Sequence, residues 1–394
     1  MNRPFTLMLG LALLMVACNF ISLVAGPTPT VETPTAAVTD TPIPPTDTPI
    51  PTETPTTTPP PVDYGPDNFP NDVNPLTGLP VSDPTRLERR PLSIKIQIFP
   101  REERPPIGVS FADIVYDYYQ NNGLTRFNAI FLGNDVDQVG PVRSARLLDV
   151  SLIRMYKAIF AFGGADKKIL NQLFNSDFYN RLVVEGANNC PPMCRVDPNG
   201  YNFLITNTLE LGKYIVGKGV DNGRQNLNGM KFQYLPPENG QLGLQIQARY
   251  SISSYNRWDF DQGSGKYLRF QDTQEDQGGG ENYQPMGDRI SNVQIMADNV
   301  VVIFIPHSYA YKSGNSEVID IEMVSGGPGV AFRDGLAYEV RWSRPANDAV
   351  LTLTFPDGTP FPYKPGVTWY QVMGMSSIKE TKEGGIWRFE IKFP

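Results

Sequence analysis

Ile114-Val-Tyr-Asp-Tyr-Tyr119 and Arg126-Phe-Asn-Ala-Ile-Phe-Leu132 are two apolar-rich runs separated by Asn121-Asn122-Gly123. Asn and Gly tolerate the positive φ that a tight turn requires. The stretch therefore predicts a β-hairpin. Just before it, Leu92–Ile98 alternates apolar and polar residues with a period of two, which predicts a half-buried strand next to the hairpin.

Helical patterns surround this predicted sheet. Ser110–Asp113 has the spacing of a capped helix start, and Ser144 is expected to cap a helix that continues to about Lys157. Ile159–Phe162 follows as a short buried strand, and two further helices are expected near 165–175 and 207–217. The first half of the folded chain is therefore expected to be mixed α/β.

From about residue 231 the pattern changes to short alternating runs separated by Gly, Asp, Asn and Pro, which predicts a mainly β structure. The runs lie at 246–252, 266–271, 299–305, 317–323, 336–342, 349–355 and 386–392. The sequence thus predicts an α+β protein. Its mixed α/β N-terminal domain spans 73–230, its mainly antiparallel β C-terminal domain spans 231–394, and the two are able to share one core.

The N-terminus has the pattern of a lipoprotein signal. Residues 4–18 carry no charge and follow Arg3, and this run is shorter than the roughly 20 apolar residues of a membrane-spanning helix. It ends in Leu14-Met-Val-Ala-Cys18, which resembles a lipobox with Met15 where Leu is usual. We expect residues 1–18 to be the signal segment and Cys18 to carry acyl chains, palmitate among them. Two chains suffice for stable anchoring. The alternatives are an ordinary cleaved signal and an uncleaved anchor.

Residues 19–72 are expected to form a disordered stalk. Within them, 27–62 contain 12 Pro and 13 Thr and no Lys or Arg. Proline excludes helices and sheet ladders, so this tract predicts a semi-rigid polyproline II spacer. With this anchor and spacer, we expect the folded body outside the cytoplasm, at the outer face of the cytoplasmic membrane. The threonines of this tract are candidates for O-glycosylation.

The composition argues against several classes of ligand and catalytic site. The net charge is −7 and there is no basic block, which argues against nucleic-acid binding. Cys190 and Cys194 lie four positions apart in an exported chain, so we expect a disulfide. The rival is a zinc site, which normally needs four Cys or His ligands. His307 is the only histidine, and beside a proline it is expected at the surface without a catalytic role. We expect neither a metal nor a cofactor.

Several segments together resemble a known family. In order they are Asn74-Pro-Leu-Thr-Gly-Leu79, Ala112-Asp-Ile-Val-Tyr116, Thr125-Arg-Phe127, Gly140-Pro-Val-Arg-Ser-Ala-Arg146, Asp259-Phe260, Gly265-Lys-Tyr-Leu-Arg269, Asp334-Gly335 and Pro365-Gly-Val-Thr-Trp369. The series, over about residues 74–375, resembles the YerB-like lipoproteins, a family of unknown function with an N-terminal and a C-terminal part. The resemblance implies an envelope lipoprotein with an α+β body, and no established reaction. One departure is Tyr201-Asn202, where the family often carries His-Asn.

The best candidate for a functional site is the segment from Gly140 to Arg146. A helix start at Ser144 would offer free amide hydrogens to an anion, and Arg143 and Arg146 are able to bind a carboxylate or phosphate in bidentate fashion. Arg126 from the hairpin and Asp113 complete the ligand-binding candidates. The structural alternative is that these arginines pair with Asp113, Asp117 or Asp149 and lock the core.

Other side chains suggest weaker candidates. A glycan hydrolase needs two carboxyl groups at a defined separation. Asp113 and Asp117 would share one face of a helix, but if Asp117 lies on a strand, as predicted, the two do not form such a pair. Asp259, Asp261 and Asp272 lie among Gly and Asn, but without the ligand spacing of an EF-hand they are expected in solvated loops. Aromatic residues on two neighbouring strands either stack on glycan or fill the core, and the core is the commoner outcome. These are Tyr255, Trp258, Phe260, Tyr267 and Phe270.

The leading hypothesis is a non-enzymatic, lipid-anchored cell-envelope protein that binds an anionic ligand or a protein partner around Arg143, Ser144 and Arg146. The first alternative is a hydrolase of cell-wall glycan or peptide that uses carboxylates such as Asp113. The second is a structural envelope assembly factor. The membrane, through the lipid on Cys18, is the expected partner in each case.

Overall fold

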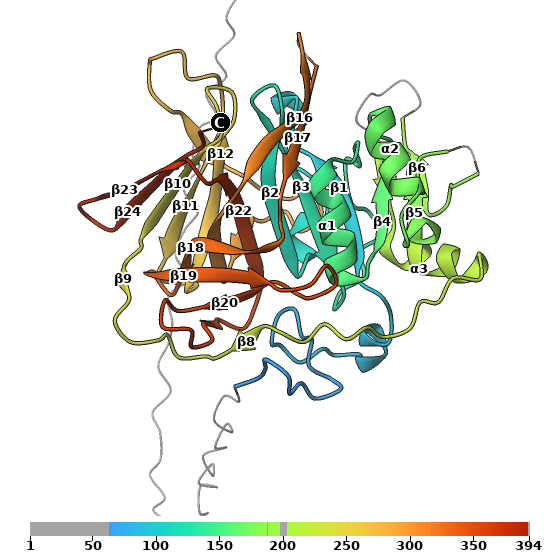
Figure 1. Cartoon of the computed structure of the whole chain (residues 1–394), viewed down its shortest axis with the longest axis horizontal. Coiled ribbons are helices and arrows are strands. Elements are labelled where there is room, and N and C mark those ends of the chain that lie inside the picture. The colour runs from blue at the N-terminus through green and yellow to red at the C-terminus, as the bar shows by residue number, and fades with distance from the viewer. Residues whose placement is uncertain (1–62, 187, 198–202, 315, 393–394) are drawn as a thin grey trace, which may run out of the picture. The chain divides into compact units, whose positions relative to one another are not determined.

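The hairpin predicted at 114–132 forms and lies inside the largest sheet (Figure 1). The computed structural model describes residues 63–392 apart from 187, 198–202 and 315. The signal segment, Cys18, most of the predicted stalk and Tyr201-Asn202 therefore lie outside the described residues.

The larger sheet contains eleven strands with mixed directions. In spatial order they are β20 (Thr352–Thr354), β19 (Leu336–Arg344), β18 (Ser325–Arg333), β15 (Asn299–Ile305), β22 (Thr368–Gly374), β2 (Ile114–Asn121), β3 (Leu124–Phe131), β1 (Leu92–Gln97), β4 (Ile159–Phe162) and β5 (Leu182–Val184), with β9 (Gln241–Leu242) beside β19.

One strand joins the two halves of the chain. β22 lies between β15 and β2 and is parallel to both. Five strands from the first half therefore continue directly into strands from the second half. The expected boundary near residue 230 stays a prediction, because strands from both sides of it share this sheet.

The second sheet contains seven strands and comes entirely from the second half, which is mainly antiparallel as expected. Its strands are β13 (Tyr283–Pro285), β12 (Lys266–Asp272), β11 (Tyr255–Asp261), β10 (Gln245–Arg249), β24 (Ile386–Glu390) and β23 (Ile378–Lys382), with β14 (Met296–Ala297) beside β12. Three short pairs complete the strands: β16 (His307–Ser313) with β17 (Ser316–Ile321), β21 (Pro362–Tyr363) with β8 (Lys231–Phe232), and β6 (Met193–Arg195) with β7 (Leu204–Thr206).

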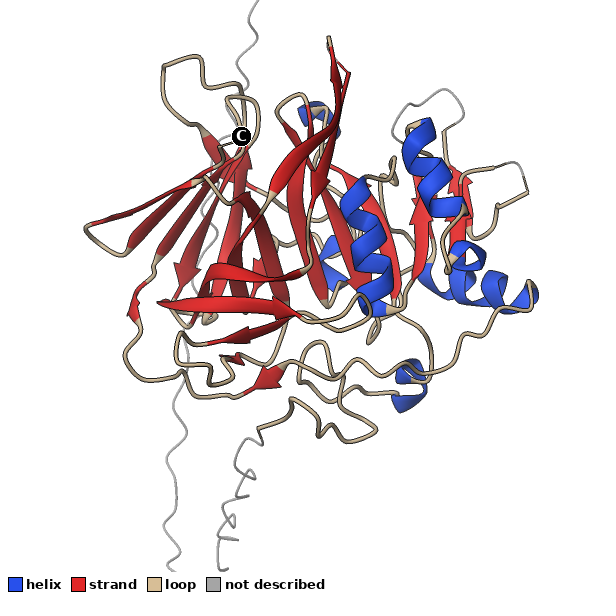
Figure 2. Ribbon diagram, in the orientation of Figure 1, coloured by secondary structure: helices blue, strands red, loops and turns tan. Residues whose placement is uncertain are grey.

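The helices belong to the first half of the chain and gather beside β1, β4 and β5 (Figure 2). They are α1 (Leu147–Tyr156), α2 (Lys167–Phe174) and α3 (Thr208–Gly217), with the 3-10 turns η1 (Pro84–Leu87), η2 (Arg101–Glu103), η3 (Val109–Phe111) and η4 (Tyr179–Arg181). The helices expected at 165–175 and 207–217 are confirmed. So is the Cys190–Cys194 disulfide, whose Cα atoms lie 4.8 Å apart.

Three local predictions were wrong. Ser144 does not cap a helix, because α1 begins three residues later at Leu147 after Arg146. Ser110 lies inside η3, and Asp113 follows that turn instead of entering a helix. Leu92–Gln97 is buried on both faces and not on one, because β1 lies between β3 and β4 and its polar side chains bind groups under α1.

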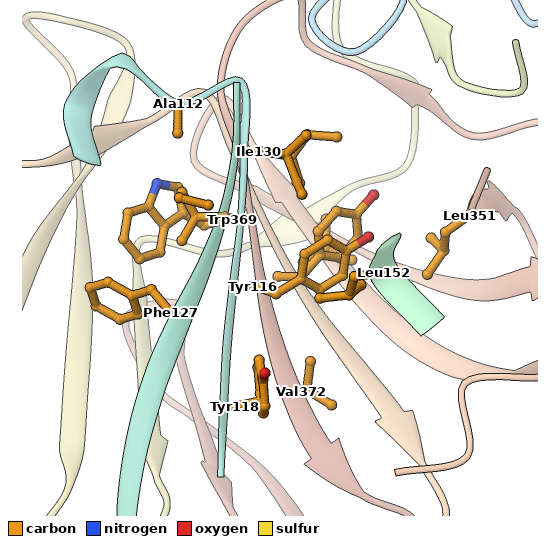
Figure 3. Close-up of a cluster of buried hydrophobic side chains, with 14 of the residues drawn as sticks. Ala112, Tyr116, Tyr118, Phe127, Ile130, Leu152, Leu351, Trp369 and Val372 are labelled. Atoms are coloured by element: carbon orange, nitrogen blue, oxygen red, sulfur yellow. The ribbon is translucent and has the colours of Figure 1, made fainter. Parts of the chain in front are cut away.

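The two faces of the hairpin pack against different parts of the protein (Figure 3). Tyr116 stacks on Tyr370 of β22, with ring centroids 4.7 Å apart, and its hydroxyl is hydrogen-bonded to Tyr156 of α1. On the opposite side, Phe127 meets Trp369 edge to face, at 5.0 Å between ring centroids. Side chains alternate along a strand, so one face of β2–β3 packs on α1 and the other faces the smaller sheet.

A buried ion pair joins the two sheets. Arg269 of β12 donates to Asp117 of β2 at 2.7 Å, and both side chains are completely buried. The guanidinium carbon lies 4.8–5.2 Å from the ring centroids of Phe127, Trp258 and Trp369. The aromatic rings exclude water and so lower the local dielectric constant. The attraction between the two charges is therefore strong, and removing one of them would be costly.

We predict that Arg269→Met lowers the free energy of unfolding by roughly 3–5 kcal/mol, because it leaves the Asp117 carboxylate buried without its counter-charge. Urea denaturation followed by tryptophan fluorescence measures the change. Combining Arg269→Met with Asp117→Leu is expected to restore much of the loss, because no buried charge remains.

The matched control is Lys379→Met on the edge strand β23. This change breaks the exposed pair between Lys379 and Glu339 of β19. Such a pair is worth less than about 1 kcal/mol. A loss at Arg269 no larger than this control would contradict the central role of the buried pair.

Candidate anion-binding site

The segment that carries the candidate arginines is held against the end of β1. Ile96 and Val142 form an antiparallel bridge, and the backbone amide of Arg143 donates to the carbonyl of Lys95 at 2.9 Å. The amide of Gly163, just after β4, donates in turn to the carbonyl of Arg143 at 3.0 Å. The backbone of Arg143 is therefore fixed between β1 and the end of β4, directly next to Lys95.

The guanidinium groups of Arg126 and Arg146 converge on Ser144. Arg126 donates from Nη1 to the Ser144 carbonyl at 2.8 Å. Arg146 donates from Nη1 to the Ala145 carbonyl at 2.8 Å and from Nη2 to Oδ1 of Asn121 at 3.0 Å. The structure thus brings together the arginines of the hairpin and of the segment before α1, as the sequence predicted.

A buried polar network lies beneath these arginines. Lys95 of β1 donates from Nζ to the hydroxyl of Tyr118, which itself donates to Oδ1 of Asp149 in α1. Nζ of Lys95 is also 3.4 Å from that carboxylate oxygen, and Asn128 donates to it at 2.8 Å. Sequence reasoning missed Lys95 and Tyr118. The available signal was a lysine at the centre of an apolar strand.

The cationic side chains of the cluster repel one another. The pKa of the Arg126 guanidinium is lowered well below its usual value, first by burial and then by repulsion from Arg146 and Arg143. Burial also lowers the pKa of Lys95 to about 7, despite the attraction of Asp149, and Arg126 and Arg146 lower it further. Such shifts are concentrated at binding and catalytic sites.

For Arg126 and Arg146, the alternative in which carboxylates neutralise the arginines is not observed in the described part of the chain. There, neither Arg126 nor Arg146 forms an ion pair with a carboxylate, and the Nε atom of Arg126 is buried without a hydrogen-bond partner. Asp117 is occupied by Arg269, and Asp149 binds Lys95, Tyr118, Asn128 and the Arg146 amide. The positive charge at Arg126 is therefore left without an acidic partner.

Asp113, which we expected to join the arginines, lies at the opposite end of β2. Its carboxylate accepts hydrogen bonds from Asn74 at 2.9 Å and from the amides of Leu132 and Gly133. It borders a separate cavity of about 390 Å³, which Asp298 and Lys266 also line. Burial raises the pKa of Asp113 to about 6. Its contacts close the turn after β3, so its role at this position is to fix the loop.

The structure contradicts the expectations for His307 and for two of the three aspartates that were expected in loops. His307 is buried and not at the surface: its Nδ1 is 2.8 Å from the Ile305 carbonyl, and burial lowers its pKa to about 4. Asp259 and Asp272 belong to strands and pair with arginines, so they are not in solvated loops; Asp261 ends β11 at an exposed turn.

Three of the five aromatic residues fill the core, which we considered the commoner outcome: Tyr255, Trp258 and Tyr267 are completely buried. Phe260 is partly buried and packs against Tyr267, and Phe270 is partly buried beside the Arg257 guanidinium. Within residues 63–392, outside the gaps given above, no group of three His, Cys, Asp or Glu side chains is arranged to hold a metal ion. In the same residues, no helix is long and apolar enough to span a bilayer.

Comparison with known proteins places this geometry in a family. Residues 76–220 match the family "Protein of unknown function (DUF3048) N-terminal domain", and residues 246–370 match its C-terminal domain. The chain belongs to the YerB-like family. All five candidate ligand-binding residues lie in the N-terminal family domain.

Two relatives within the family are informative. "Putative lipoprotein YerB" of Bacillus subtilis (strain 168) is 26% identical over 307 residues, which cover 76% of this chain and 85% of the relative. The crystal structure of YerB from Bacillus subtilis has a TM-score of 0.62 and 24% sequence identity, and covers 76% of this chain and 96% of that chain. At this identity the structural likeness establishes the fold alone.

We predict that the free energy of unfolding rises with pH above 7. Lys95 has a pKa of about 7 in the folded protein and an ordinary value of 10.5 when unfolded, so between these values the unfolded chain binds the extra proton. The gain is at most roughly 1.4 kcal/mol per pH unit. Urea denaturation at several pH values measures it, and Lys95→Met should flatten the profile. The same rise in the Lys95→Met variant would assign it to other groups.

Proposed function

We propose that this protein is a lipid-anchored envelope protein whose folded body binds an anionic ligand through Arg126, Arg143 and Arg146. The observation that carries the proposal is the crowding of three guanidinium groups above buried Lys95, with the Nε atom of Arg126 buried and unsatisfied. Buried like charges destabilise the empty site. An anion would relieve this repulsion and accept charge-assisted hydrogen bonds.

The location follows from the N-terminal pattern. The apolar run that ends at Cys18 and the Pro/Thr tract after it support an acylated N-terminus with the body held away from the membrane on its outer face. The lipoprotein name of the Bacillus relative supports the same placement.

We favour anion binding over the other two hypotheses. A hydrolase that used Asp113 would need a free carboxyl oxygen, and both oxygens of Asp113 already accept hydrogen bonds. A purely structural factor has no need for a buried cation such as Arg126, which forms no ion pair with a carboxylate among the described residues. A protein partner that offers a carboxylate or a phosphate remains compatible with the site.

We predict that replacing both Arg143 and Arg146 by Ala abolishes anion binding. Thermal unfolding of the full-length protein is measured with inorganic phosphate, sulfate, succinate and acetate. A bound anion at about 100 times its dissociation constant stabilises the folded state by roughly 2.7 kcal/mol, and the double variant should lose this gain.

The control is Arg154→Ala in α1, the helix that follows these arginines, which removes one arginine paired with the exposed Asp177. It should keep the response to anions. If no anion stabilises the wild-type protein, or if the double variant responds as the wild type does, the proposal is wrong.

We predict that Cys18→Ala releases the protein from the membrane, because it removes the acyl acceptor. Metabolic labelling with palmitate and separation of membrane and soluble fractions measure the outcome. Cys190→Ala, which removes only the disulfide in the body, should keep the label. Unchanged labelling and membrane association of Cys18→Ala would contradict acylation at this residue.

A further inference from the structure

We propose that the cavity of about 390 Å³ beside Asp113 binds a neutral, hydroxyl-rich ligand, in chemical terms a sugar unit. The cavity lies at the start of β2, whereas Arg146 contacts Asn121 at the end of that strand. The inference therefore goes beyond the proposed function and does not depend on it. A free sugar and the sugar unit at the end of a glycan share this chemistry.

The cavity lies where the two halves of the chain meet. Asp113, Val367 and Asp298 directly precede the parallel strands β2, β22 and β15, and all three line the cavity. Lys266, the first residue of β12 in the smaller sheet, lines it as well. Small-molecule sites usually have volumes of about 300–1,000 Å³. The cavity is therefore large enough for one small ligand.

One carboxylate oxygen in this cavity is left without a donor among the described residues. The side chain of Asp298 is 6% exposed, and its Oδ2 accepts from Nζ of Lys266 at 3.1 Å and from the Val367 amide at 2.9 Å. Its Oδ1 accepts no hydrogen bond from the part of the chain that the structure describes. An acceptor without a donor in a nearly buried side chain is costly, and a ligand that donates to it removes this cost.

The backbone leaves room for this carboxylate. Gly366 has a φ of +139°, and a Cβ atom there would lie 2.0 Å from Oδ2 of Asp298. Any other residue at this position would therefore displace the Asp298 carboxylate. The amide of Gly366 also donates to the carbonyl of Thr77 at 2.8 Å, which ties the loop before β22 to another part of the cavity wall.

The cavity also offers hydrogen-bond donors. Nζ of Lys266 carries three hydrogens and, among the described contacts, donates one of them to Asp298. Thr77 is 6% exposed, and its Oγ1 accepts from the Leu79 amide at 3.3 Å. The hydroxyl hydrogen of Thr77 has no acceptor within the described residues. A ligand in the cavity therefore meets one acceptor and two donor groups.

The protein itself compensates the charges that line the cavity. The ammonium of Lys266 has Asp298 as its counter-charge, and Arg86 lies 3.5 Å from the carboxylate of Asp135. The carboxylate of Asp113 accepts three hydrogen bonds. An anionic ligand would meet the two carboxylates of the cavity, and a cationic ligand would meet its two basic groups. A neutral ligand avoids both repulsions.

Hydroxyl groups match this arrangement better than amides do. A hydroxyl donates one hydrogen bond and accepts others, so two neighbouring hydroxyls of a sugar are able to donate to Oδ1 of Asp298 and to accept from Nζ of Lys266. A trans peptide group directs its N–H and its C=O to opposite sides, so one such group reaches only one of these two atoms. The apolar side chains of Leu79, Val81 and Val367 also line the cavity and suit the C–H face of a sugar ring.

The experiment is a ligand-observed NMR titration of the full-length protein with glucose, glucuronate and glucosamine, which share a ring and differ in charge. Glucose should bind more tightly than either charged analogue. Asp298→Asn, which removes the charge of the acceptor, should weaken glucose binding about tenfold, because hydrogen bonds to charged groups are the stronger ones. Asp177→Asn, in an exposed pair with Arg154, is the matched control and should bind glucose as the wild type does.

A second variant keeps the test decisive if Asp298→Asn does not fold. Ser82 lines the cavity and is exposed, so the fold should tolerate Ser82→Tyr, and the larger side chain should hinder entry of the sugar. Wild-type affinity for glucose in this variant would overturn the proposal. Tighter binding of glucuronate or glucosamine than of glucose would overturn the assignment of a neutral ligand.

Two further measurements separate the possible sources of the sugar and the two sites. Cellohexaose presents a glucose unit at the end of a chain, so comparison with glucose distinguishes a glycan end from a free sugar, and binding of either supports the inference. If neither binds, the proposal fails. The variant with both Arg143→Ala and Arg146→Ala should bind these sugars as the wild type does, so the anion site and the sugar site fail or stand separately.

Discussion

The buried pair between Asp117 and Arg269 is the constraint on which the rest of this structure depends. It links a strand of the first half to a strand of the second, and it holds the two sheets together at their aromatic interface. Two charges without solvent are costly unless they lie close to each other and form further hydrogen bonds. Asn256 donates to the Asp117 carboxylate and Gln271 accepts from Arg269, whereas the Nε and Nη1 atoms of Arg269 are buried without a hydrogen-bond partner. The pair therefore selects one register and one orientation for the packing of the sheets.

The same hairpin has a different kind of electrostatics on its other face. Asp117 faces the smaller sheet and is matched by one arginine, whereas Tyr118, one residue later, points toward α1 and the cationic cluster. On the face toward the smaller sheet, the carboxylate of Asp117 has a guanidinium as its counter-charge. On the face toward α1, cationic side chains lie close together. A structural role accounts for the balanced face. The burial of Arg126 beside other cations, with no ion pair of its own among the described residues, has no such explanation within the fold, and this contrast directs the search for a ligand to that face.

Much of the architecture was predictable from local patterns. The hairpin, α2, α3 and seven strands of the second half follow from turn residues and from the spacing of apolar positions. β22 was missed as a strand, although its sequence was noted, because a strand covered on both faces has no alternation to reveal it. Ser144 was assigned as a helix cap by residue type, but its carbonyl binds Arg126 and the helix begins after Arg146. Asp113 was grouped with the arginines although β2 separates them.

By itself, the sequence determined the lipoprotein-like N-terminus, the Pro/Thr spacer, the α+β class, the local disulfide and the arginines of the candidate site. These depend on composition, spacing and short-range geometry. Only the tertiary structure decided that the two halves share a sheet, that Arg269 finds Asp117, and that Lys95 lies buried under Arg126 and Arg146. Each of these contacts joins residues far apart in the chain, and their energies depend on the burial that the complete fold creates.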